Sequence, residues 1–270
     1  MMITDFSKPV ENIRKELEEY IVRCGIKSLV IGISGGIDSA ICSVLALPVC
    51  EKLGIPLIGR SIAIETNKED EIVRAKKIGA YFCTDFKEVD LTDFHKGFIG
   101  MLKVEEGQND GDDYSLKIRH GNIKARIRMI YLYDLANKNS GMVLSTDNKT
   151  ELLVGFWTLH GDVGDYGMIQ NLWKTEVYAM ARYLAGRYDG KMEESITECI
   201  DAIPTDGLGI TSSDFDQLGV KSYDECDMIL KDYAEEGNNR YKDHPVISRH
   251  RRTGYKRMNP FNIPRDKIFK

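Results

Sequence analysis

Hydrophobic residues in the first part of the chain switch between helical spacing and short continuous runs. Residues 10–24 carry apolar side chains on one helical face, and Gly25 follows where a helix would end. Residues 28–33 read SLVIGI, a short β-branched run that predicts a buried strand. A glycine pair comes next, and residues 39–47 return to helical spacing until Pro48, which ends or interrupts the predicted helix.

Further strands and helices are predicted in alternation. An apolar run predicts a second strand at 57–64. The next helix is expected at 69–78 with Thr66 or Asn67 as its cap, and a third strand at 81–84. This βαβαβ order favours an α/β fold, a doubly wound, Rossmann-like parallel sheet with helices on both faces.

The second half begins with a polar, acidic stretch at 104–115, which we expect to be an exposed loop. A long helix is predicted from near Asn122 to Leu135, a buried strand at 142–145 and a helix at 176–187. Pro and Gly make 201–213 irregular. No internal repeat is visible, and we expect one domain over residues 1–270.

The composition is that of an ordinary globular protein, with 37 Lys and Arg against 42 Asp and Glu and a net charge of -5. No apolar run approaches the roughly 18 residues of a membrane helix, and no signal-like segment opens the chain. We therefore expect a cytoplasmic protein that does not enter a membrane. The six cysteines form no C-x-x-C pair and the five histidines show no metal spacing, so we expect reduced thiols and no histidine ligand.

Positive charge is concentrated at the end of the chain. Residues 237–270 hold ten Lys and Arg against two Asp, a net charge of +8, which leaves the other residues at -13. This basic C-terminal tail either binds an anionic ligand or forms a solvated basic face.

A glycine loop, GISGGIDS at residues 32–39, joins the first predicted strand to its helix. In an open α/β sheet, ligands bind at this edge. The glycines let the backbone approach an anion, and the helix start and the two serines supply donors, which together suit phosphate. Asp38 beside phosphate implies an intervening cation such as Mg²⁺. A glycine turn with a capping aspartate is the alternative without a ligand.

The pattern S-G-G-x-D-S after a buried strand resembles the pyrophosphate-binding loop of the ATP pyrophosphatases, and neither of the commoner nucleotide-loop patterns occurs. Residues 121–129, GNIKARIRM, resemble a helix of the ammonia-dependent NAD synthetases. Matching stretches at 144–148, 151–162, 172–177, 204–206, 218–227 and 256–260 follow in that family's order. The resemblance runs from about residue 11 to 264.

The resemblance implies a role for each matching residue. Those implied to contact ATP are Gly32, Ile33, Ser34, Gly35, Gly36, Ile37, Asp38, Ser39, Thr146, Lys174 and Thr205. Those implied to contact deamido-NAD are Arg126, Asp165, Tyr255 and Lys256. Asp38 and Glu151 would hold Mg²⁺, and Asp162, near the attacking ammonia, would be catalytic together with Lys174.

The implied reaction is the amidation of deamido-NAD. ATP adenylates the carboxylate with release of pyrophosphate, and ammonia then displaces AMP to give NAD. The chain leaves no room for a glutamine-hydrolysing domain, so the expected donor is free ammonia or ammonia delivered by a separate protein. The family also implies a homodimer and no nucleic-acid partner.

Three positions depart from the family pattern. Leu159 stands where a lysine is usual, Tyr255 replaces a histidine, and the segment around Asp165 is one residue shorter. Either His160 and the tail arginines contact the substrate instead, or the substrate is a different acid. Two other interpretations stay open, a different adenylating enzyme such as a tRNA-modifying one and a non-catalytic ATP-binding module.

Overall fold

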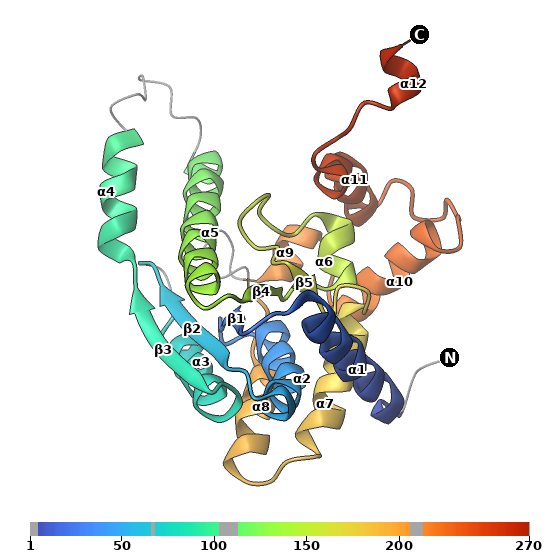
Figure 1. Cartoon of the computed structure of the whole chain (residues 1–270). Helices are drawn as coiled ribbons and strands as arrows, with labels where there is room; N and C mark the ends of the chain where they lie inside the picture. Colours follow the sequence, from blue (N-terminus) through green and yellow to red (C-terminus); the bar gives the residue numbers. More distant parts are fainter. Residues whose placement is uncertain (1–4, 66–67, 103–112, 206–212, 270) are drawn as a thin grey trace.

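The computed structural model describes residues 5–65, 68–102, 113–205 and 213–269. Its strands form one five-stranded parallel sheet in the order β3-β2-β1-β4-β5 (Figure 1). The strands are β1 (Leu29–Gly32), β2 (Leu57–Ala63), β3 (Asp85–Asp90), β4 (Met142–Ser145) and β5 (Tyr166–Gly167).

Helices precede, connect and follow the strands. The larger helices are α1 (Ser7–Cys24), α2 (Ile37–Leu53), α3 (Glu69–Phe82), α4 (Thr92–Leu102), α5 (Asp113–Lys138), α7 (Lys174–Ala185), α8 (Lys191–Asp201), α10 (Tyr223–Ala234) and α11 (Pro245–Arg252). The short ones are α6 (Lys149–Val154), α9 (Asp214–Leu218), the 3₁₀ helix η1 (Gly254–Met258) and α12 (Arg265–Ile268). Among the described helices, none combines the length and the apolar character required to cross a bilayer.

The sheet is buried on both faces because successive strand residues point to opposite sides. Leu29 and Ile31 of β1 pack into a core shared with α1, α2, α3, α7 and α8. Val30, between them, packs on the other side against α5, through residues such as Ile127 and Leu132. The two helical layers lie on opposite sides of the sheet in Figure 1. The predicted doubly wound α/β fold is therefore confirmed.

The strand order creates a crevice between β1 and β4. The chain runs from β1 outward to β2 and β3 on one side, then crosses to β4 on the other side of β1. The loops that follow β1 and β4 therefore separate at the carboxyl edge, where open α/β sheets bind ligands. A second apolar cluster, with Val154, Trp173, Leu230 and Ile247 in it, joins α6, α10 and α11 and covers the approach to this edge.

Several predicted boundaries were wrong. The third strand is not at 81–84, because α3 continues through Phe82 and β3 begins at Asp85. This edge strand reads DFKEVD and is largely exposed or half-buried, so it lacks the apolar run that marks a buried strand. The helix expected to begin near Asn122 begins at Asp113, and α2 continues past Pro48 to Leu53.

The expected loop at 104–115 is only partly tested. Residues 113–115 are helical, because they form the start of α5, and residues 104–112 lie outside the described residues. Thr66 and Asn67, expected to cap the next helix, also lie outside them, and Lys68 occupies the N-cap position of α3. The same holds for 206–212 within the irregular stretch at 201–213.

Candidate active site

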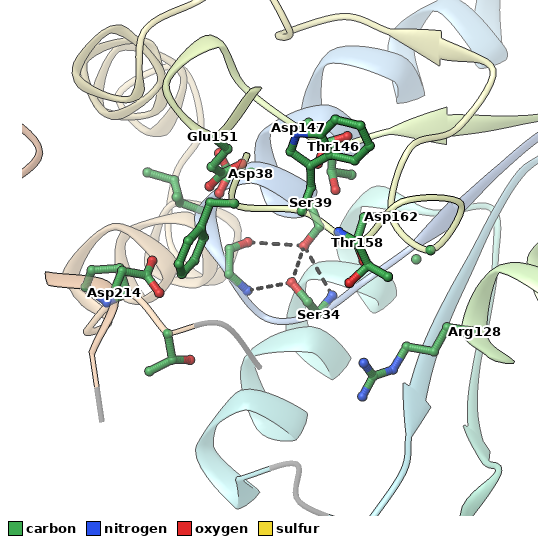
Figure 2. A pocket seen from close by; sticks show the side chains of 18 of the residues that line it. Ser34, Asp38, Ser39, Arg128, Thr146, Asp147, Glu151, Thr158, Asp162 and Asp214 are labelled. Carbon is green, nitrogen blue, oxygen red and sulfur yellow. Dashed lines mark hydrogen bonds between the residues drawn. The ribbon is translucent and has the colours of Figure 1, made fainter. Parts of the chain in front are cut away.

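A cavity of about 720 Å³ opens at the carboxyl edge of the sheet, in the crevice between β1 and β4. Figure 2 shows the residues that line it, with Asp38 and Glu151 together on one side and Asp162 with Thr158 on the other. We call these the cation end and the acyl end. The glycine loop forms the wall between them.

The glycine loop is held in shape by its own serines. The hydroxyl of Ser39 donates to the carbonyl of Gly36 at 3.2 Å, and the hydroxyl of Ser34 accepts from the backbone N–H of Gly36 at 3.2 Å. Gly35 has φ of +83°, and a Cβ there would lie 2.2 Å from the backbone oxygen of Glu71. A side chain at Gly35 is therefore excluded both by backbone conformation and by space.

The start of α2 provides an anion site. Its N-cap residue, Gly36, has extended backbone and no side chain that could cap the helix. The first N–H groups of a helix have no partner within it and carry the positive end of its dipole. Because Gly36 and Ile37 line the cavity, these groups can meet a phosphate there.

Lys174 binds the two candidate metal ligands together. Its Nζ lies 2.5 Å from Oδ2 of Asp38 and 2.8 Å from Oε1 of Glu151. The Nδ2 of Asn148 donates to the other oxygen of Asp38 at 2.9 Å. Three segments far apart in the sequence, α2, α6 and the start of α7, are thereby joined at the cation end.

Hydrogen bonds to Thr150 and Asp227 hold the backbone at the start of α7 in place. The N–H of Lys174 donates to the hydroxyl of Thr150 at 2.9 Å, and that hydroxyl donates to Asp227 of α10 at 2.5 Å. The second oxygen of Asp227 accepts from the N–H of Thr175 at 2.9 Å. The buried carboxylate of Asp227 thus caps α7 and sets the direction in which Lys174 enters the cavity.

The charges at the cation end do not balance. Burial opposes the charge of Lys174, but Asp38 and Glu151 outweigh it and hold the pKa of the ammonium well above its usual value. Burial, with Asp38 close by, raises the pKa of Glu151 despite the neighbouring Lys174. One ammonium therefore cannot neutralise both carboxylates, and the cation end is suited to further positive charge.

Asp38 and Glu151 fit a magnesium ion. Their oxygens converge on one cationic nitrogen, which demonstrates that both can reach the same cation. Mg²⁺ binds one or two carboxylates and takes its remaining ligands from phosphate and water. A phosphate bound at the neighbouring glycine loop would place its oxygens beside the two carboxylates.

Most of the predicted ATP contacts line the same cavity. Thr146 follows β4 directly. Thr205 lies in the loop after α8, and its hydroxyl donates to Oε1 of Glu71 on α3 at 3.0 Å. Gly35 is the exception, because it is not among the residues that line the cavity and packs closely against α3 instead. The loop, Thr146, Lys174 and Thr205 come from four parts of the chain that only the fold brings together.

The acyl end contains Asp162, Tyr255 and Lys256. Asp162 is half-buried, accepts from the backbone N–H of Thr158, and has a pKa raised by burial. Lys256 donates to the carbonyls of Gly155 and Trp157, and burial lowers its pKa. This end therefore combines a cation held against two carbonyls with a half-buried carboxylate, and Tyr255 at its rim is 62% exposed.

Arg126 and Asp165 do not line this cavity. Arg126 is exposed on α5, and its Nε donates to the carbonyl of Leu159 at 3.1 Å. Both carboxylate oxygens of Asp165 are engaged, one by the hydroxyl of Tyr133 at 3.0 Å and one by the N–H of Val143 at 2.9 Å. Within one chain neither residue lines the cavity that holds Tyr255 and Lys256, although Arg126 is close enough to contribute to the lowered pKa of Lys256.

The cavity also holds residues that the sequence reasoning did not single out. They are Asp147, Trp157, Arg128, Arg249 and Arg252. Asp147 lies inside a matched motif between Thr146 and Asn148, so its position was the available signal. Arg128 also lies inside a matched motif, residues 121–129, whereas Arg249 and Arg252 were indicated only by the net charge of the tail.

The sequence model of the NAD synthase family matches residues 9–260. An NH3-dependent NAD(+) synthetase of Thermoplasma acidophilum is 32% identical over 266 residues, which cover 96% of this chain and 98% of that protein. An NMN synthetase structure from Francisella tularensis superposes with a TM-score of 0.79 at 25% identity, over 97% of this chain and 100% of that one. An NH3-dependent NAD synthetase structure from Campylobacter jejuni, in complex with nitrate, gives 0.72 at 24% identity over 96% and 100%.

Gly35→Ala should damage both the fold and ATP binding. Gly25→Ala is the matched control, because Gly25 also has positive φ but nothing lies within 4 Å of a Cβ there. We expect a loss of about 1 kcal/mol for the control, and a larger loss with ATP binding weakened at least about tenfold for Gly35→Ala. Thermal denaturation and calorimetric titration with ATP would measure this, and equal losses in the two variants would contradict it.

Stability without divalent cations should fall as pH rises from 6.5 to 8. Burial, followed by Asp162, raises the pKa of Asp147 to about 7. Between the unfolded pKa of about 4 and that value, the native state holds a proton that the unfolded state has lost, so the free energy of unfolding decreases with pH. His95 and His250, whose pKa values are lowered mainly by burial, oppose this only below about pH 6.5.

Calorimetry across this pH range would test the sign. Asp147→Asn should reduce the dependence of Tm on pH and leave the part that comes from Glu151, whose pKa burial raises to about 8. Asp93→Asn, at an exposed acid on α4, should leave the dependence unchanged. An equal slope in Asp147→Asn and the parent protein would refute the assignment.

Proposed function

This chain belongs to the NAD synthase family, and we propose that it amidates deamido-NAD with ammonia, converting ATP to AMP and pyrophosphate. Such an enzyme is a ligase that forms a C–N bond. The observation that carries the proposal is that one cavity contains both a set of groups suited to ATP and a set suited to a nitrogen nucleophile. A phosphate loop with two carboxylates and a lysine lies at one end, and a buried acid beside a lysine lies at the other.

The first half-reaction is adenylation of the acid. A carboxylate oxygen of the substrate attacks the α-phosphorus of ATP, a P–O bond forms, and the bond to pyrophosphate breaks. The N–H groups at the start of α2, the serines of the loop and Lys174 would hold the phosphates and neutralise charge on the leaving pyrophosphate. Mg²⁺, bound by Asp38 and Glu151, would supply further charge neutralisation on the phosphate oxygens.

The second half-reaction is attack by ammonia on the acyl carbon. A C–N bond forms, the bond to AMP breaks, and the nitrogen loses a proton. Asp162 is placed to hold the nitrogen nucleophile, because its carboxylate is fixed by Thr158 and remains partly accessible from the cavity.

A mononucleotide acid is a second candidate substrate. Arg126 and Asp165, which the family pattern assigns to the dinucleotide, lie outside the cavity of one chain, and Leu159 replaces the usual lysine. The similar NMN synthetase is named for a mononucleotide product. Nicotinate mononucleotide carries the same reacting carboxylate but needs no site for a second nucleotide.

A homodimer would complete the dinucleotide site. Arg126 lies on the same exposed stretch of α5 as Ile130 and Tyr133, which are 65% and 40% exposed, and nearby α4 exposes Phe94 and Phe98. A second copy packed on this face would bury these side chains and bring Arg126 close to a neighbouring cavity. We also propose a cytoplasmic location, which agrees with the six free thiols.

The proposed reaction predicts equimolar NAD, AMP and pyrophosphate from ATP, Mg²⁺, ammonium and deamido-NAD. Asp38→Ala should lower pyrophosphate release by about 100-fold or more, because it removes a proposed ligand of the Mg²⁺ that neutralises the phosphates and a partner of Lys174. Glu51→Gln, at an exposed acid on the same helix, should retain full activity. Chromatography of the nucleotides measures all three products. Pyrophosphate release by Asp38→Ala at the parent rate would remove Asp38 from the site.

The choice of acid can be measured by comparing kcat/KM for deamido-NAD and nicotinate mononucleotide. If the chain uses the dinucleotide, Leu159→Lys should raise kcat/KM for deamido-NAD by about tenfold, the effect of one added charge-assisted contact. It should change the value for the mononucleotide little. No change with deamido-NAD would indicate that another cation, such as Arg252, already fills this role.

A further inference from the structure

Asp147 has no role in the reaction described so far, although it lies at the centre of the site. It is 6% exposed, lines the cavity, and accepts a hydrogen bond from the hydroxyl of Ser145 at 2.9 Å. Its neighbours in the chain are Thr146, on the ATP side, and Asn148, which holds Asp38. The carboxylate is therefore fixed at the junction of the two ends of the cavity.

Asp147 and Asp162 form a pair of acids on this cavity. Figure 2 shows both side chains at the cavity, Asp147 from the loop after β4 and Asp162 from the segment before β5. Burial, followed by Asp162 and more weakly by Asp38, raises the pKa of Asp147 to about 7, whereas Ser145 and Lys174 oppose the shift. Burial also raises the pKa of Asp162, although Arg128 and Lys256 lie near it and favour its charged form. The two acids therefore line one cavity, and the charge of Asp162 acts on Asp147.

The chemistry of amidation requires two proton acceptors. At neutral pH ammonia is present mostly as ammonium, which carries four hydrogens, whereas the amide product carries two on the same nitrogen. One proton must leave before the nitrogen can attack, since ammonium has no lone pair. The second must leave after the C–N bond has formed. The departing AMP takes the bonding electron pair to its phosphate oxygen, whose conjugate acid has a pKa of about 6, so an enzyme carboxylate with a higher pKa is the stronger acceptor.

We propose that Asp147 and Asp162 together bind ammonium and accept its two protons, one on each carboxylate. The inference rests on the proposed function and adds Asp147 to it as a second catalytic acid–base residue. The pair binds ammonium through charge and hydrogen bonds, so the enzyme uses the abundant protonated form. Ser145 orients Asp147 through its hydroxyl and is a positioning residue.

The decisive experiment separates the two half-reactions in Asp147→Asn. ATP–pyrophosphate exchange in the presence of the acid reports adenylation, and NAD formation from ammonium reports amidation. At pH 7 we expect amidation to fall about 100-fold and exchange to fall by less than about threefold. Asp232→Asn is the control, because Asp232 is also a buried acid but lies on α10 outside the cavity, and both rates should be retained.

The pH profile gives an independent readout. In the parent protein, kcat/KM for ammonium should rise to a plateau with an apparent pKa near 7. In Asp147→Asn that limb should disappear, and the residual rate should follow the concentration of free ammonia up to high pH. Ser145→Ala should move the limb upward, because the hydrogen bond that stabilises the ionised form is lost.

Each outcome decides the proposal. Full amidation by Asp147→Asn at pH 7, or equal loss of exchange and amidation, would overturn it. If Asp147→Asn does not fold, an unmoved pH limb in Ser145→Ala would overturn it instead. If the parent protein shows no exchange with deamido-NAD or nicotinate mononucleotide, the proposed function itself is wrong. The proposed role of Asp147 and Asp162 in amidation then falls with it.

Discussion

The ammonium of Lys174 between Asp38 and Glu151 is the interaction on which the site depends. The three side chains come from α7, α2 and α6, and each is close to the start of its helix. Removing Lys174 would leave two buried carboxylates without compensation, which costs several kcal/mol. The contact therefore fixes how the glycine loop, the segment after β4 and the C-terminal helices stand relative to one another. The phosphate-binding geometry follows from that arrangement.

The cation end carries two carboxylates against one ammonium, and this excess negative charge suits it to binding cations. Asp147 and Asp162 add to the two carboxylates at the cation end, and burial raises the pKa of Glu151, Asp147 and Asp162. A protein interior holds such a cluster only when function or partner charges offset its cost. Here the offset differs along the cavity. Lys174 acts at one end, and Arg128 and Lys256 act at the other. The cation bound with ATP would meet the carboxylates of Asp38 and Glu151. The ammonium nucleophile would meet those of Asp147 and Asp162.

The sequence predicted the contiguous parts of this arrangement and missed those that depend on tertiary geometry. The glycine loop and the strand before it could be predicted because strand, turn and helix start follow directly in the chain. The edge strand β3 could not, because its sequence DFKEVD is largely polar and exposed and has no apolar run. The pairing of Asp38 with Glu151 came from the family resemblance alone, and nothing in the spacing of Lys174 indicated that it lies between them. Arg126 and Asp165 matched the family pattern too, but only the fold could show that they lie outside the cavity of one chain.

The segment from Ser145 to Glu151 explains why two half-reactions can share one cavity. Asn148 caps α6 by accepting from the N–H of Glu151 at 3.1 Å and also holds Asp38, so it faces the cation end. Asp147, one residue earlier, is held by Ser145 and interacts electrostatically with Asp162 as well as with Asp38 and Glu151. This short segment therefore contributes residues to both ends of the cavity. A shift of this segment would therefore move the phosphate site and the nitrogen site together. That coupling keeps the acyl carbon, once adenylated, within reach of the nucleophile.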